Sequence, residues 1–116
     1  MDLKAKKCIP YSSYTPPLSD KEKKMLSEAL GPAWRLTKND SRLVREFKFK
    51  NFKKALEFTN EVGKISEEEK HHPEIHLGWG HCDLEIWTHV NDNLLENDFI
   101  LAAKISEVYA KFSGPS

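Results

Sequence analysis

The sequence has few of the features that point to secretion, a membrane or nucleic acid. Its only cysteines, Cys8 and Cys82, form no Cys-x-x-Cys pair and no disulfide framework, so a reducing compartment fits best and we expect a cytoplasmic protein. No apolar segment resembles a signal peptide or approaches the length of a membrane span. Lysine plus arginine equals aspartate plus glutamate, at 18 each. No overall positive field therefore exists to hold phosphates, and we expect neither a nucleic acid nor a membrane partner.

The residues that are present have the balance of a folded protein. Apolar residues make up 39% of the 116 residues and charged residues 31%, and this length is enough for one hydrophobic core. Residues 1–18 contain Pro10, Pro16 and Pro17 among serines and tyrosines, which predicts an irregular N-terminal arm. Residues 19–116 are interpreted as a single domain.

The spacing of apolar residues predicts three helices and four strands. Ser19 and Glu22 form a capping box that begins the first helix, Gly31 ends it, and Asn51 can cap the second. The expected helices span about residues 19–30, 52–70 and 96–112, and the expected strands 34–37, 43–49, 74–79 and 82–88. The order α-β-β-α-β-β-α predicts an α+β fold, with a four-stranded antiparallel sheet and three helices packed on one face.

The last predicted helix carries apolar residues around more than one stripe of its surface. One sheet face cannot cover so much apolar area. We therefore expect a homodimer or homotetramer built partly on this helix.

All five histidines lie between positions 71 and 89. Three interpretations are open: structural histidines, a metal site, or acid–base catalysis. For His76 on a strand and His81 in a turn, a structural role is the simplest. Adjacent residues such as His71 and His72 rarely direct their side chains at one ion, and no H-E-x-x-H or Cys/His ligand spacing is present. Imidazole titrates near neutrality and suits proton transfer.

The histidines belong to a longer pattern that resembles a known family. The pattern reads Glu67-x-x-x-His71-His72-Pro73, then five residues to Trp79, nine more to His89 and eight more to Asp98. Arg45-x-Phe47-x-Phe49-x-x-Phe52-x-x-Ala55 and the pair Thr88-His89 accompany it. From about Leu18 to Tyr109, the chain resembles the pterin-4a-carbinolamine dehydratases.

The resemblance implies a function. Family members are hydro-lyases that dehydrate 4a-hydroxytetrahydropterin to quinonoid dihydropterin, in the recycling of tetrahydrobiopterin, with a pterin as substrate and no metal or organic cofactor. The alternative is a non-catalytic interaction protein, because some animal members act as a dimerisation cofactor of a transcription factor.

The resemblance also suggests roles for single residues. His71 and His89 would be the acid–base pair, and the third catalytic histidine, His72, would bind and orient the pterin. Glu67 lies one helical turn before His71, so the two side chains are expected to share a face, and Glu67 is expected to orient an imidazole and favour its charged form. The remaining expected substrate-binding residues are Pro73, Thr88, Trp34 and Asp98. For Trp34, and for Trp79 as a second candidate for an aromatic wall, core packing is the alternative; for Asp98 it is a favourable charge at a helix N-terminus.

Overall fold

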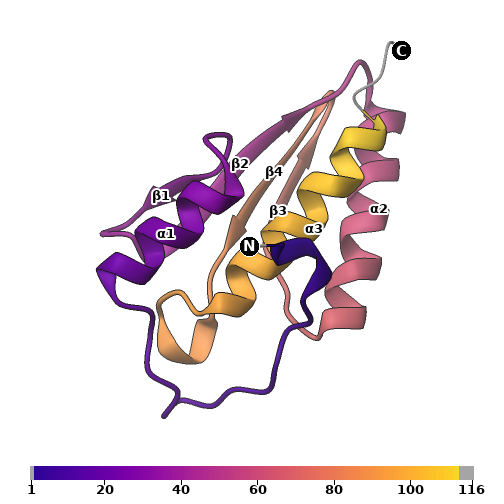
Figure 1. The fold of residues 1–116 in the computed structure, drawn as a ribbon. Coiled ribbons are helices and arrows are strands. Elements are labelled where there is room, and N and C mark those ends of the chain that lie inside the picture. Colours follow the sequence, from indigo (N-terminus) through magenta and orange to yellow (C-terminus); the bar gives the residue numbers. More distant parts are fainter. Residues whose placement is uncertain (1, 113–116) are drawn as a thin grey trace.

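The computed structural model describes residues 2–112 and has the predicted order of helices and strands (Figure 1). The three helices are α1 (Asp20–Leu30), α2 (Phe52–Glu69) and α3 (Glu96–Phe112), and the strands are β1 (Arg35–Thr37), β2 (Arg42–Lys48), β3 (Glu74–Gly78) and β4 (His81–Ile86). Two short 3-10 helices are added, η1 (Leu3–Ala5) and η2 (His89–Asn91). The predicted α+β class is confirmed.

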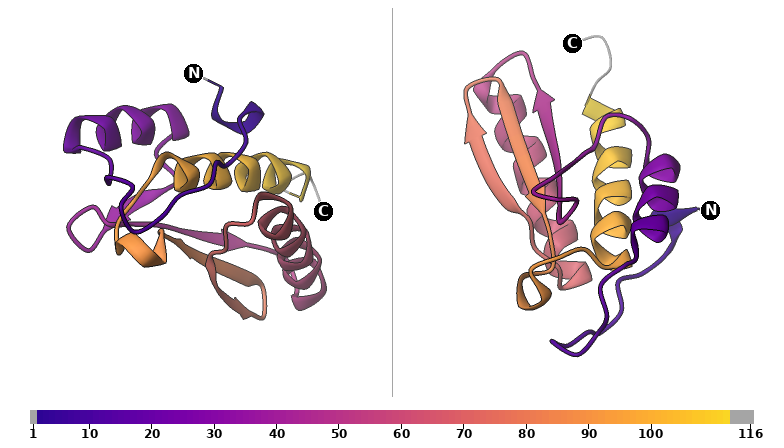
Figure 2. Two further views of the ribbon diagram at one scale, coloured as in Figure 1. Left: turned by 90° about the horizontal axis from the view of Figure 1, so that it is seen from below. Right: turned by 90° about the vertical axis from the view of Figure 1, so that its left-hand side faces the viewer.

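The four strands form one antiparallel sheet in the order β1-β2-β4-β3. The helices lie over one face of this sheet, and the other face is open (Figure 2). Alternate residues of the central strands point to the helices, as Leu43, Phe47, Cys82 and Ile86 do, and these are fully buried. The core thus lies between the helices and the two central strands, β2 and β4.

Local signals in the sequence set the ends of the helices. The capping box of α1 is present, because Ser19 accepts from the backbone N–H of Glu22 and the Glu22 carboxylate accepts from that of Ser19. Asn51 caps α2 through a 2.8 Å bond from the Lys54 N–H. Lys70 follows α2 in the left-handed conformation, with φ of 55°, and the chain leaves the helix there.

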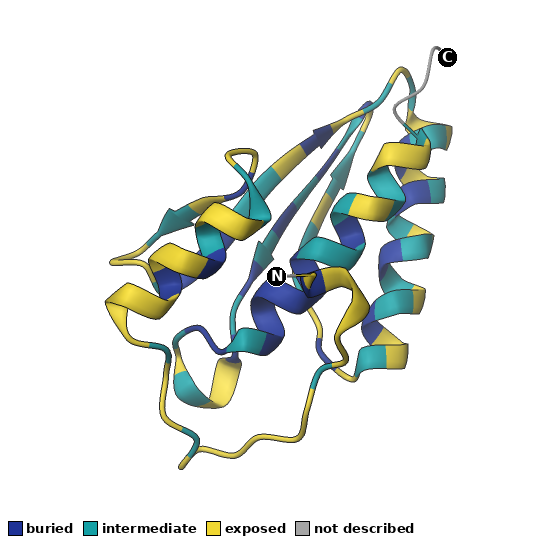
Figure 3. Ribbon diagram, in the orientation of Figure 1, coloured by how far each residue is buried: buried dark blue, intermediate teal, exposed yellow. Residues whose placement is uncertain are grey.

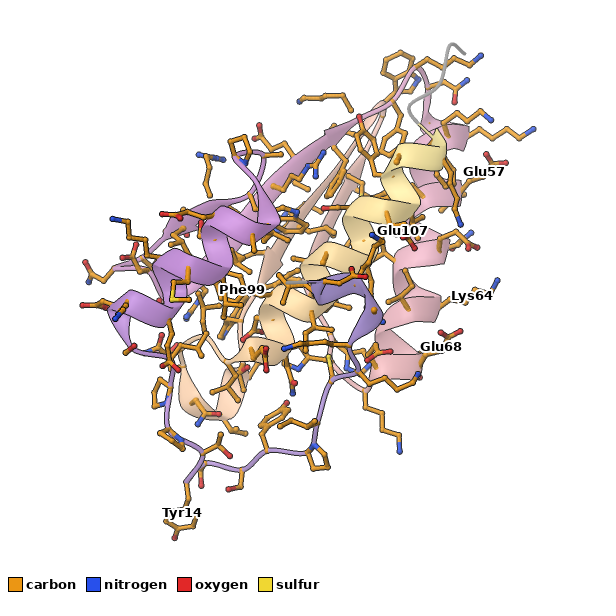
Figure 4. The ribbon with its side chains drawn as sticks, viewed as in Figure 1. Tyr14, Glu57, Lys64, Glu68, Phe99 and Glu107 are labelled. Atoms are coloured by element: carbon orange, nitrogen blue, oxygen red, sulfur yellow. The ribbon has the colours of Figure 1, made fainter. Side chains whose placement is uncertain are left out.

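Helix α3 lies at the centre of the helical layer. It contacts α1, α2, η1 and β2, and Phe99, Leu101 and Ile105 are fully buried (Figures 3 and 4). The apolar surface that suggested a second subunit is therefore largely covered within the chain. The oligomer stays a prediction, without this argument in its favour.

Within residues 2–112, no helix combines the length and the apolar character needed to cross a membrane.

Candidate functional site

The side chains of the adjacent residues His71 and His72 point in different directions, because α2 ends at Glu69 and the chain turns at Lys70. After the left-handed turn at Lys70, His71 is 3% exposed, whereas His72 is exposed. The Glu67 carboxylate contacts the Nε2 atom of His72 at 2.5 Å. The expectation that Glu67 shares a face with His71 is therefore wrong: helical spacing stops at Glu69, and the carboxylate orients the neighbouring imidazole.

The buried histidine is held by the buried aspartate of α3. His71 Nε2 lies 2.5 Å from Asp98 Oδ1, and Asp98 is 0% exposed. The other carboxylate oxygen accepts from the Thr88 hydroxyl and from the Leu95 backbone N–H, each at 2.8 Å. Three donors suit an ionised carboxylate. Such a carboxylate favours a proton on His71 Nε2, and the neutral tautomer with that proton has its lone pair on Nδ1.

The Nδ1 atom of His71 is buried and has no hydrogen-bond partner among the described residues. A buried polar atom without a partner is costly, and such atoms gather at functional sites. The imidazole thus presents one tethered nitrogen and one free nitrogen, as a proton-transferring histidine requires.

Thr88 and Asp98, both expected near a pterin, form a hydrogen-bonded network with His71. Thr88 is fully buried and its hydroxyl is used by the carboxylate. Asp98 also lies in the first turn of α3, where it accepts from the N–H of Leu95, so the expected interaction with the helix N-terminus is real as well. Sequence reasoning missed the His71–Asp98 pair, because 27 residues separate the partners.

His89, the third histidine of the motif, packs against an aromatic ring. The exposed His89 ring lies against the Trp87 ring, with centroids 4.4 Å apart and planes 30° from parallel. The Arg42 guanidinium lies 4.3 Å from the same indole and pairs with Asp92. Trp87 was not among the predicted site residues. Its position directly before the Thr88-His89 pair was the signal available in the sequence.

The N-terminal segment also reaches this region. The Tyr11 ring meets His71 edge-on, at 5.7 Å between centroids and 86° between planes. The Asn97 side chain, next to Asp98, accepts from the N–H of Ile9 and donates to its carbonyl. Sequence reasoning gave Tyr11 no role.

The Cys8 thiol lies close to the same helix end. It donates to the Asn97 carbonyl, and its backbone N–H donates to the Glu69 carboxylate. Burial, followed by the charge of Glu69, raises the pKa of Cys8 to about 12. This cysteine is consequently a neutral thiol at physiological pH and does not provide a nucleophile.

Both tryptophans proposed as aromatic walls lie elsewhere. Trp34 is buried in the core, where its indole N–H donates to Ser106, eight residues along α3 from Asp98. Trp79 is 72% exposed in the turn after β3, at the end of that strand remote from His72. Core packing accounts for Trp34, and the structure brings neither ring to the His71–Asp98 pair.

His76 and His81 belong to the open side of the sheet. His76 is exposed on β3, opposite Asp83 of β4, and His81 Nδ1 lies 3.1 Å from an Asp83 oxygen. A Cβ at Gly78 would come within 2.3 Å of the His81 ring, so glycine lets this ring lie over the strand. A structural role on the open face of the sheet accounts for both His76 and His81. Across the described part of the chain, no three His, Cys, Asp or Glu residues are grouped so that they could hold a metal ion.

The chain is similar to known proteins over most of its length. Residues 16–108 match the family model described as "Pterin 4 alpha carbinolamine dehydratase". The chain is 48% identical over 106 residues to a protein of Alkaliphilus metalliredigens named "Putative pterin-4-alpha-carbinolamine dehydratase", with 91% of this chain and 95% of the relative covered. A protein of the same name from Rickettsia canadensis is 48% identical over 103 residues, covering 89% and 94%.

Solved structures show the same fold. The Brucella melitensis protein described as a "transcriptional coactivator/pterin dehydratase" superposes with a TM-score of 0.74 and 27% identity, covering 80% of this chain and 98% of that one. A "pterin dehydratase-like protein" described as a RuBisCO assembly factor of the alpha-carboxysome gives a TM-score of 0.59 at 20% identity, covering 68% and 95%. The second likeness concerns the fold alone.

Proposed function

The chain belongs to the pterin-4-alpha-carbinolamine dehydratase family, and we propose that it catalyses the family reaction, the dehydration of 4a-hydroxytetrahydropterin to quinonoid dihydropterin. The observation that carries the proposal is the buried His71–Asp98 pair with a free Nδ1 atom. A chain that only kept the fold would have no need to bury an aspartate and a histidine against each other, because buried ionisable pairs are expensive.

The reaction requires two proton transfers and no change of oxidation state. The bond from C4a to the hydroxyl oxygen breaks, and the hydroxyl leaves as water after it takes a proton from a protonated imidazole. A ring N–H gives its proton to a neutral imidazole as the new double bond to C4a forms. Histidine supplies both forms near neutral pH, and general acid–base catalysis of this kind is worth about 10²–10⁴-fold.

His71 and His89 are the proposed acid–base pair. His71 would act through Nδ1, because Nε2 is used by Asp98. The His89 ring is exposed and steadied by the Trp87 indole, which favours a defined direction for proton transfer. Thr88 and Asp98 are proposed as positioning residues for His71 rather than as groups that touch the pterin.

His72 is the proposed binding residue. Its exposed ring is oriented by Glu67, so it can present its remaining nitrogen to the polar edge of a pterin. Pro73 follows His72 and leads into β3, and the Pro73 backbone is proposed to lie beside the bound pterin ring. Trp34 is left out of the proposed site because its indole is used in the core.

Replacing the histidines one at a time tests these roles. His71→Ala and His89→Ala should each lower kcat by up to about 10²–10⁴-fold, and by less where the other histidine compensates. The double variant should lose more than either single one. His72→Ala should raise KM more than it lowers kcat. His76→Ala is the matched control, and a loss of activity as large as that of His71→Ala in folded protein would contradict the assignment.

The rival function is a non-catalytic interaction protein of the coactivator kind. The Brucella melitensis relative carries both descriptions, so the likeness itself does not separate them. The two functions differ in what they need: an interaction surface tolerates His71→Ala and Asp98→Asn, whereas the dehydratase does not. Wild-type protein without turnover of 4a-hydroxytetrahydropterin would favour the rival.

A further inference from the structure

The N-terminal segment Cys8–Thr15, called the strap below, is fixed on both sides of Tyr11. Before it, the Cys8 N–H donates to Glu69 at 2.8 Å and Ile9 makes two hydrogen bonds with the Asn97 side chain, of 3.0 and 2.8 Å. After it, the Asn91 amide donates to the carbonyls of Ser12 and Thr15, at 3.3 and 2.8 Å. The strap crosses the end of the molecule where α2 ends and α3 begins (Figures 1 and 2).

The backbone around Tyr11 is therefore held on both sides, whereas no hydrogen bond to the described residues holds its side chain. Pro10 restricts the chain further, since its own φ is locked and it favours an extended conformation for Ile9. The Tyr11 ring remains 37% exposed. Such a ring can change rotamer in nanoseconds without moving the backbone that carries it.

The ring rests on the one histidine of the motif that is buried. His71 is 3% exposed, its Nδ1 atom has no partner, and the Tyr11 ring packs edge-on against it. A nitrogen that must exchange a proton with a substrate cannot remain covered during the reaction. Either the whole strap lifts, against its hydrogen bonds, or the Tyr11 ring alone swings aside.

We propose that Tyr11 controls access to His71: its ring covers the imidazole in the free protein and swings aside to admit the pterin, while the strap stays anchored. The proposal rests on the proposed dehydratase function. A site that is open only part of the time binds with an apparent affinity reduced by the open fraction. Removing the ring should then improve binding rather than harm it.

Chemical labelling tests the cover without any need for turnover. Diethylpyrocarbonate acylates accessible, unprotonated imidazoles, and tandem mass spectrometry separates His71 from His72. In the full-length wild type, His72 should react and His71 should be protected. Tyr11→Ala should speed the labelling of His71 by about tenfold or more relative to His72. Tyr11→Phe should behave like the wild type, because the edge contact remains.

Tyr14 provides the matched control on the same strap. Its side chain is 93% exposed and projects away from the protein (Figure 4). Tyr14→Ala should leave the labelling of His71 within about twofold of the wild type, as expected for a surface position. Equal protection of His71 in Tyr11→Ala and in the wild type would overturn the proposal, since the ring would then not be the cover.

Kinetics provide the second readout. Tyr11→Ala should lower KM by about 3–10-fold and keep kcat within about twofold, because only the cost of opening is removed. A KM that rises, or a kcat that falls tenfold, would overturn the proposal and make Tyr11 a direct contact of the substrate. If Tyr11→Ala exposes His71 to labelling but neither the wild type nor any variant turns over pterin, the proposed dehydratase function is wrong. The proposal that Tyr11 covers His71 is then still supported.

Discussion

Changing Asp98 to asparagine alters the charge and the hydrogen bonding of the buried network with almost no change in shape. In the wild type, one carboxylate oxygen accepts from His71, and the other accepts from Thr88 and Leu95. An asparagine keeps both Thr88 and Leu95 satisfied only if its carbonyl faces them. Its NH₂ group then faces His71 Nε2, and two donors would meet across 2.5 Å.

The conflict is relieved when the His71 proton moves from Nε2 to Nδ1. The neutral ring then has no lone pair at Nδ1 for a substrate proton, so kcat should fall by about 10²–10⁴-fold with a small change in KM. Losing one charge-assisted hydrogen bond costs up to about 3 kcal/mol of unfolding free energy, and removing a buried charge offsets part of that cost. The variant should remain folded.

Two measurements on purified Asp98→Asn check this reasoning. Steady-state dehydration of 4a-hydroxytetrahydropterin gives kcat and KM, and ¹⁵N NMR of the imidazole reports which nitrogen of His71 carries the proton. Thr88→Val is the control, because it removes one donor to the carboxylate without reversing the tautomer, and its loss of kcat should be smaller. A folded Asp98→Asn with kcat within about threefold of the wild type would refute the role of the pair, as would a proton still on Nε2.

Further predictions concern the stacked ring, the buried thiol and the assembly. In folded protein, Trp87→Leu should lower kcat by about tenfold, because His89 loses its support; an unchanged kcat would show that the stack is dispensable. With its pKa near 12, against 9.0 for an ordinary thiol, Cys8 should react with iodoacetamide at pH 8 about a thousandfold more slowly than in unfolded chain. Its reactivity should rise with pH up to about 12, and Glu69→Gln should accelerate it; fast labelling of the folded chain at pH 8 would contradict this. Light scattering should show a dimer or tetramer, and a monomer at micromolar concentration would end that expectation.

The architecture could be predicted from the sequence because local signals determine it. The capping box at Ser19, the cap at Asn51 and the alternation of buried residues in β4 are each determined within a few residues of the chain. The predicted extent of α3, about residues 96–112, agrees with the helix Glu96–Phe112 of the structure. Strand order was not predicted, because pairing β2 with β4 depends on contacts across the whole domain.

For the candidate site, the sequence predicted which residues take part but not how they contact one another. The motif contained His71, His72, His89, Thr88 and Asp98, but it did not show that Asp98 hydrogen-bonds to both His71 and Thr88. Helical spacing placed Glu67 on the face of His71, although the predicted helix already ended near residue 70; the left-handed conformation of Lys70 brings His72 to the Glu67 carboxylate instead. The His71–Asp98 contact, which spans 27 residues of the chain, cannot be found from periodicity.

The contact between Tyr11 and His71 shows the same limit. A proline-rich arm predicts irregular structure but not its path, and here side chains of Asn91 and Asn97 determine that path from the other end of the chain. The apolar surface of α3 was likewise misread as a reason to expect an oligomer. Helix α3 is apolar on several sides because α1, α2, η1 and β2 of its own chain surround it.

The rate of water loss from 4a-hydroxytetrahydropterin is the most direct test of the central claim. The substrate is formed in the cuvette, and the appearance of quinonoid dihydropterin is followed with and without the purified chain. We expect catalytic amounts of wild-type protein to accelerate the reaction well beyond its spontaneous rate, and the His71→Ala, His89→Ala double variant to return it close to that rate. A wild-type chain that is folded and binds pterin, yet leaves the spontaneous rate unchanged, would contradict the account.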